Sequence, residues 1–186
     1  GAITAPNGKP FTDVVQIGIG GSDLGPRALY LALKAWAEKH HTLKMNAHFI
    51  SNVDPDDAAA VLSSVNLDTT LFILVSKSGT TLETLTNERF VGQFLKNAGL
   101  DPAKQMVAVT SETSPLANSS AYLASFYMDD FIGGRYSSSS ACGGVVLSLA
   151  FGYEVFAAFL NGAADADKQA LEPNIRNNAA LMDALI

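Results

Sequence analysis

Cysteine and basic residues are scarce in this sequence of 186 residues. Cys142 is the single cysteine, so an internal disulfide is excluded, and this usage suits a reducing compartment. The 12 lysine and arginine residues stand against 18 aspartate and glutamate residues, and they form no cluster that could neutralise a nucleic-acid backbone. We therefore expect no nucleic-acid partner.

Long hydrophobic runs and charged residues are also scarce. The most apolar run, 145–160, is interrupted by Ser148, Gly152 and Glu154 and is too short to span a membrane. No signal peptide precedes the first predicted strand, so we expect a cytoplasmic protein that does not enter a membrane. Charged residues make up 16% of the sequence, below the roughly 25% usual in soluble domains. Part of the surface is therefore expected to be covered, by a partner subunit or by further chain.

What the sequence does contain is an alternation of short apolar segments with helical patterns. The predicted strands are 13–18, 45–50, 70–75, 106–110 and 125–128. The predicted helices are 26–40, 54–64, 81–98, 114–120, 140–160 and 166–185. Strands separated by helices favour right-handed crossovers and a parallel sheet covered on both faces. We predict an α/β fold with a doubly wound five-stranded parallel sheet in the order 2-1-3-4-5, forming a single domain over 1–186.

A hydroxyl-rich turn follows the third predicted strand, in the segment Ser76-Lys77-Ser78-Gly79-Thr80-Thr81. We name residues 76–81 the hydroxyl turn. It combines hydroxyl donors, a glycine that permits close backbone approach and the free amides of a helix beginning near Thr81. The positive end of the helix dipole points at the same place, which is what a phosphate monoester requires. The hydroxyl turn therefore predicts a phosphate site.

A capping box is the alternative interpretation of this turn. In it, Thr80 caps the helix and Glu83 reaches back to the cap amide. This arrangement explains one hydroxyl and leaves Ser76, Ser78 and Thr84 without a role. Both interpretations can hold together.

A second turn, rich in glycine, follows the first predicted strand. We name Gly20-Gly21-Ser22 the glycine turn. A dinucleotide fingerprint needs a further glycine three residues after Gly20, and Asp23 stands there with a side chain that would oppose a pyrophosphate. The turn either lets the helix pack closely on the sheet or offers the amides of Gly21 and Ser22 to a ligand. In a sheet of the predicted order, it would face the same anion as the hydroxyl turn.

No cofactor or metal site is expected. A Walker motif is absent because Lys77 precedes Gly79 instead of following it. His40 and His41 come at the C-terminal end of a predicted helix, where the dipole favours positive charge, and this position explains the pair better than metal binding does.

A third turn places one arginine after a pair of glycines, in Gly133-Gly134-Arg135-Tyr136-Ser137. We name residues 133–137 the arginine turn. Flexible backbone before a planar, permanently charged group allows Arg135 to be aimed at a phosphate or a developing oxyanion. An ordinary ion pair with an acidic residue is the alternative. Four serines, 137–140, open the following helix, and either close packing or further hydroxyl contacts would explain them.

Four segments, 8–14, 17–26, 76–87 and 133–137, occur in the order found in the glucose-6-phosphate isomerase (phosphoglucose isomerase) family, and the chain resembles that family over nearly its whole length. The segment 161–165 adds to the likeness. The family is built from two sugar isomerase (SIS) domains, and this sequence is similar to the first of them. The resemblance therefore implies a fragment of a longer enzyme with two SIS domains.

The resemblance also implies roles for residues of the three turns. The substrate phosphate would be held by Ser76, Ser78, Thr81, Thr84 and the backbone of Lys77. Gly21 and Ser22 would line the sugar, and Arg135 would be catalytic, stabilising the cis-enediolate that forms as a proton moves between C1 and C2. The implied activity is the interconversion of glucose 6-phosphate and fructose 6-phosphate, in glycolysis and gluconeogenesis, without cofactor or metal, by a cytosolic homodimer whose sites combine both subunits.

The chain also departs from the family pattern. Ser138-Ser139 stands where the family commonly has Leu-Trp. By the resemblance, the proton-shuttling glutamate, the ring-opening histidine and a late lysine belong to segments beyond this chain, so we expect the chain alone to bind sugar phosphates weakly and to catalyse nothing. A stand-alone sugar-phosphate sensor is the alternative function. Arg135 favours the enzyme, because a sensor has no transition state to stabilise.

Overall fold

The computed structural model describes residues 3–185 and contains one parallel sheet of five strands. The strand order is β2-β1-β3-β4-β5, as the sequence predicted. The strands are β1 (Asp13–Ile17), β2 (Asn46–Ile50), β3 (Thr70–Val75), β4 (Met106–Thr110) and β5 (Ala124–Tyr127). The α/β class, the parallel pairing and the strand order are therefore confirmed.

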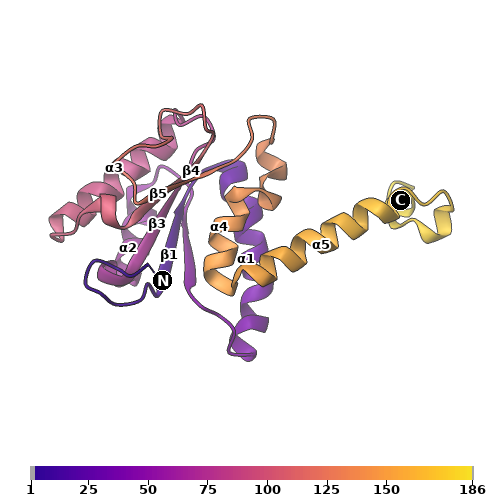
Figure 1. Ribbon diagram of the computed structural model, residues 1–186, viewed down its shortest axis with the longest axis horizontal. Helices are drawn as coiled ribbons and strands as arrows, with labels where there is room; N and C mark the ends of the chain where they lie inside the picture. The colour runs from indigo at the N-terminus through magenta and orange to yellow at the C-terminus, as the bar shows by residue number, and fades with distance from the viewer. Residues whose placement is uncertain (1–2, 186) are drawn as a thin grey trace.

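Helices cover both faces of the sheet (Figure 1). α1 (Leu24–Lys39) and α4 (Ala141–Phe151) pack on one face, and α2 (Pro55–Ser64) and α3 (Leu82–Asn97) pack on the other. α5 (Tyr153–Gln169) projects away from the body of the molecule and carries α6 (Ala179–Asp183) near its far end (Figure 1). Among residues 3–185, none of the helices combines the length and apolar character needed to cross a bilayer.

Short 3-10 helices complete the chain. They are η1 (Gly20–Ser22), η2 (Leu67–Thr69), η3 (Pro102–Lys104), η4 (Gly134–Ser139) and η5 (Ile175–Asn177). The glycine turn is thus η1, and most of the arginine turn lies within η4.

The central strand β3 is buried along its whole length, as expected for a parallel strand with helices on both sides. Ile73 and Val75 pack with the core under α1 and α4, whereas Phe72 and Leu74 pack with the core under α2 and α3. β1 lies beside β3 in parallel, with Ile17 opposite Leu74. Because both strands end at the same edge, the glycine turn and the hydroxyl turn leave the sheet side by side.

The prediction of a helix over 114–120 is wrong. The segment forms turns instead, since serine hydroxyls bind backbone amides two residues ahead. Ser111 Oγ accepts a hydrogen bond from Thr113 N, Ser114 Oγ accepts one from Leu116 N, and Ser119 Oγ accepts one from Ala121 N. Such local bonds offer the backbone an alternative to the helix.

The predicted C-terminal helices have different bounds. The segment 140–160 is divided between α4 and α5 by Gly152, whose φ of 99° and ψ of 151° are accessible mainly to glycine. The helix predicted over 166–185 is wrong, because α5 ends at Gln169. Asn174 and Asn178 instead cap the short helices η5 and α6 with their side chains.

Candidate functional site

The hydroxyl turn is held in shape by Ser76, which is only 3% exposed. Its backbone N–H donates to the carbonyl of Val109 at 3.0 Å, and its hydroxyl accepts from Gly79 N at 3.2 Å. The same hydroxyl lies 3.4 Å from Thr81 Oγ1. Gly79 has a φ of 67°, and a Cβ there would collide with Ser114 Oγ. The turn is therefore a fixed structure that needs glycine at position 79.

Several donors of this turn and of the first turn of α3 remain available for a ligand. Within residues 3–185, no acceptor takes a hydrogen bond from the backbone N–H of Lys77 or Ser78, or from the hydroxyl of Thr84. The first three amides of α3, from Leu82 to Thr84, have no intrahelical acceptor either. Ser78 Oγ accepts bonds from Thr80, which leaves its own proton free to donate. The turn thus presents a group of unpaired donors at the positive end of a helix.

The capping-box interpretation of this turn is wrong. The N-cap residue of α3 is Thr81, and its side chain makes no capping hydrogen bond. Thr80 lies one residue too early and donates its hydroxyl proton to Ser78 Oγ at 3.0 Å. The hydroxyls of this segment are therefore not used in the way that a capping box requires.

The glycine turn and the arginine turn are in direct contact, although they are far apart in sequence. A Cβ on Gly21 would collide with the backbone of Gly134, so the contact depends on the missing side chain. Ser137 Oγ lies 3.0 Å from the carbonyl oxygen of Gly21 and 2.7 Å from that of Gly134. It therefore joins the two turns, and this explains one of the four serines.

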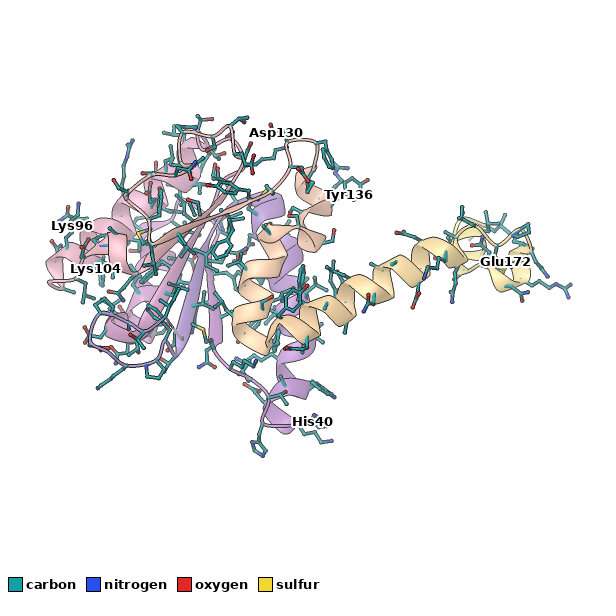
Figure 2. All side chains as sticks on the ribbon, in the orientation of Figure 1. His40, Lys96, Lys104, Asp130, Tyr136 and Glu172 are labelled. Atoms are coloured by element: carbon teal, nitrogen blue, oxygen red, sulfur yellow. The ribbon has the colours of Figure 1, made fainter. Side chains whose placement is uncertain are left out.

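Arg135 is exposed. Among residues 3–185, no carboxylate lies within ion-pair distance of its guanidinium group. The ion-pair alternative is thus wrong for the described chain. Asp130 and Tyr136 lie at the same end of the molecule, where the loop before Arg135 meets η4 (Figure 2). The guanidinium group remains available for an anion.

Lys77 connects the hydroxyl turn to the segment that leads into the arginine turn. Its ammonium group donates to the carbonyl oxygens of Asp130 at 2.8 Å and Ile132 at 2.9 Å. Sequence reasoning missed this role, and it also missed the role of Ser137. No local signal could have found either, since the partners of Lys77 lie 53 and 55 residues away and the Gly21 partner of Ser137 lies 116 residues away.

Buried groups beneath the glycine turn are paired or neutral. Asp23 is 4% exposed and lies 2.8 Å from the guanidinium group of Arg27. Burial raises the pKa of Asp23, and Arg27 opposes that effect. Burial also raises the pKa of Cys142 to about 11, so the thiol stays protonated at neutral pH. The carboxylate of Asp23 is engaged by Arg27, which neutralises the charge that would otherwise oppose an anion at this turn.

The three turns therefore form one connected edge, and the predicted site residues lie along it. Ser76 and Thr84 are buried, Gly21, Ser22, Lys77 and Thr81 are half-buried, and Ser78 and Arg135 are exposed. Gly21 lies against the arginine turn, and Lys77 ties the hydroxyl turn to the loop before it. The hydroxyl turn can donate hydrogen bonds to an anion, and the arginine turn carries the positive charge of Arg135 on the same edge.

Comparison with known proteins gives concordant results. The phosphoglucose isomerase family model matches residues 1–186. The glucose-6-phosphate isomerase of Treponema pallidum is 73% identical over 186 residues, which are 100% of this chain and 35% of that protein. The glucose-6-phosphate isomerase of Borreliella afzelii is 52% identical over 188 residues, covering 100% of this chain and 36% of that protein.

A solved structure agrees with these relatives. The crystal structure of a glucose-6-phosphate isomerase from Chlamydia trachomatis matches with a TM-score of 0.87 and 48% identity, over 94% of this chain and 33% of that chain. The present chain thus spans about a third of the length of these relatives. Since the family model covers the whole sequence and the fold agrees, the chain belongs to the phosphoglucose isomerase family.

Proposed function

We propose that this chain is the amino-terminal SIS domain of a glucose-6-phosphate isomerase and that its connected edge binds the sugar phosphate. The observation that supports this proposal most directly is the group of donors in the hydroxyl turn that have no acceptor among the described residues, together with Arg135, which forms no ion pair among them. The parent enzyme would interconvert glucose 6-phosphate and fructose 6-phosphate, the activity that the family resemblance implies, and its relatives are named glucose-6-phosphate isomerase.

The phosphate would bind in the hydroxyl turn. Its oxygens would accept hydrogen bonds from the amides of Lys77 and Ser78, from the hydroxyls of Ser78, Thr81 and Thr84, and from the first turn of α3. These donors act locally, so the net charge of −6 does not prevent binding of a small anion. Ser76 would serve the site by fixing the shape of the turn, since it is buried, its hydroxyl accepts from Gly79 N, and its own proton is directed at Thr81 Oγ1.

The sugar would extend from there toward the glycine turn and Arg135. Gly21 and Ser22 would line the sugar, and the guanidinium group of Arg135 would stabilise the negative charge of the cis-enediolate. Moving a proton between two neighbouring carbons also needs a base within hydrogen-bond reach. We propose that this base lies in the remaining two thirds of the parent polypeptide. Glu83, exposed in the first turn of α3, is better explained by the helix dipole.

We further propose that another polypeptide surface closes over this edge, within a cytoplasmic homodimer. Four large apolar side chains around the three turns support this, with exposed fractions of 68% for Leu24, 70% for Leu82, 85% for Phe131 and 72% for Tyr136. Analytical ultracentrifugation of the full-length parent should give a dimer mass. A monomer at micromolar concentration would contradict the assembly.

A chimeric enzyme tests the activity. In it, this sequence replaces the matching 186 residues of the Treponema pallidum glucose-6-phosphate isomerase. We expect the chimera to convert fructose 6-phosphate to glucose 6-phosphate and the 186-residue chain alone to be inactive. Arg135→Met should lower kcat by roughly 100-fold or more, the usual cost of losing an oxyanion donor.

Arg89→Met, at an exposed position of α3, is the matched control and should leave kcat unchanged. Full activity of Arg135→Met would contradict the catalytic role of Arg135. Tight binding of sugar phosphate by an inactive chimera would instead favour the stand-alone sensor.

A further inference from the structure

We propose that the ammonium group of Lys77 is a positioning group, which fixes the loop before Arg135 to the hydroxyl turn and does not bind the substrate phosphate. This inference rests on the proposed function for its catalytic consequence, but its structural part can be tested without substrate. The role differs from the one proposed for the Lys77 backbone, whose N–H faces no acceptor among the described residues.

The ammonium group is already engaged. It donates to the carbonyl oxygens of Asp130 at 2.8 Å and Ile132 at 2.9 Å, which uses two of its three N–H donors. Hydrogen bonds from a charged donor are stronger than neutral ones. Holding a long side chain in one conformation costs conformational entropy, so two such bonds to one loop indicate a defined structural role.

The backbone of Lys77 is anchored to the sheet. Its carbonyl oxygen accepts from Ser111 N at 3.1 Å and lies 3.3 Å from the hydroxyl of Thr110. The preceding residue, Ser76, is bound to β4 through Val109. The lysine side chain therefore starts from a rigid point at the edge of the sheet.

The loop at the other end is held at its flanks by apolar packing, because Met128 is buried and Ile132 packs against the core under α1 and α4. Met128 N donates to Thr110 O at 3.0 Å, and Thr113 Oγ1 lies 3.4 Å from the carboxylate of Asp130. Asp130 and Phe131 are exposed. The two bonds from Lys77 therefore add a polar constraint on the backbone of Asp130 and Ile132 to the apolar packing at the flanks of the loop.

The constraint matters because two glycines, Gly133 and Gly134, separate this loop from Arg135. Gly134 is held by its contact with Gly21 and by the bond from Ser137 to its carbonyl oxygen, so the conformational freedom of glycine is greatest at Gly133. The position of Arg135 therefore depends on what holds the chain on either side of Gly133. Lys77 holds it before the glycines, and Ser137 holds it after them through Gly21. Misplacement of a catalytic group by about 1 Å can lower the rate by about 100-fold.

Amide hydrogen exchange of the 186-residue chain tests the structural part. Lys77→Met keeps the apolar stem but removes both hydrogen bonds. We expect the amide of Ile132, which donates to Asp129 O, to exchange at least about tenfold faster in this variant. Lys104→Met is the matched control, because Lys104 is exposed and lies away from the loop of Asp130 (Figure 2). Unchanged exchange at Ile132 in Lys77→Met would overturn the proposal.

Kinetics of the chimera test the consequence for catalysis. Lys77→Met should lower kcat by roughly 10- to 100-fold with little change in KM, since the phosphate ligands are intact. Lys77→Arg should recover much of kcat, because a guanidinium group can donate to both carbonyl oxygens. A raised KM with normal kcat would overturn the proposal and make the ammonium group a phosphate ligand. An inactive parent chimera would contradict the proposed function, while the exchange measurement would still decide the role of Lys77.

Discussion

Cys142 lies beneath the glycine turn, where its sulfur is 4.0 Å from the carbonyl oxygen of Gly21. Burial raises its pKa from an ordinary value of 9.0 to about 11. Between these pH values the unfolded chain has lost a proton that the folded chain keeps, so the free energy of unfolding falls as pH rises, by up to about 1.4 kcal/mol per pH unit. Below pH 9 the thiol is protonated in both states and has no effect. Urea unfolding should therefore show wild type losing more stability than Cys142→Ala between pH 9 and 11, and a constant difference would contradict this prediction.

Two glycines in different surroundings should respond oppositely to alanine. Gly21→Ala would place a Cβ against the backbone of Gly134, and we expect it to lower the free energy of unfolding by about 1–3 kcal/mol. Gly92, inside α3, has no other group within 4 Å of an added Cβ. Gly92→Ala should therefore raise the free energy of unfolding by about 0.5–1 kcal/mol. Urea unfolding measures both changes, and a neutral Gly21→Ala would mean that the two turns do not touch.

Single residues also mark the limit of sequence reasoning about the site. The hydroxyls of Ser78 and Thr84 could be identified as candidate ligands from the sequence, because a capping box would use only one hydroxyl of this segment and would leave theirs without a role. The roles of Lys77 and Ser137 could not, because each depends on a carbonyl oxygen of a distant segment. Any lysine or serine side chain can donate to a carbonyl oxygen, so these two roles can be assigned only when the fold shows which distant carbonyl oxygens lie nearby.

At the scale of elements, the junction between α4 and α5 depends on Gly152. Its φ of 99° and ψ of 151° strain any other residue, and an added Cβ would lie 2.6 Å from Lys44 Nζ. Gly152→Ala should lower the free energy of unfolding by about 1–3 kcal/mol. Gly162→Ala, in α5 with open space around it, should raise it by about 0.5–1 kcal/mol. Thermal or urea unfolding of both variants checks this, and equal effects would contradict the role given to Gly152.

Elements differed in how well the sequence predicted them. The bounds of β3 and β4 agree with the prediction because continuous apolar runs flanked by turn residues have few alternatives. The turns over 114–120 were predicted as a helix because the competing serine–backbone bonds are invisible in a pattern of apolar residues. Helix ends set by single glycine or asparagine residues, as at Gly152 and Asn178, were equally hard to recognise.

At the scale of the whole molecule, the sheet order brings the glycine turn and the hydroxyl turn to the same edge, and Gly21 brings the arginine turn there. The helix α5 projects from the body, and apolar side chains around this edge are exposed. Both features are consistent with a chain that spans about a third of the length of its relatives. In the function that we propose, binding and catalysis are divided, with the anion donors in this chain and the base elsewhere in the parent polypeptide. The central claim is that the hydroxyl turn binds the substrate phosphate.

Titration of the 186-residue chain with glucose 6-phosphate, followed by amide chemical shifts, tests this claim most directly. We predict saturable shifts at Lys77, Ser78 and Thr84 with glucose 6-phosphate and none with glucose. Thr84→Val should weaken binding by roughly tenfold or more, the cost of a hydrogen bond to a charged group. Thr86→Val is the matched control, because the hydroxyl of Thr86 is exposed and donates to Leu82 O at 2.8 Å. The absence of shifts in the hydroxyl turn at saturating glucose 6-phosphate, or equal losses in the two variants, would contradict the account.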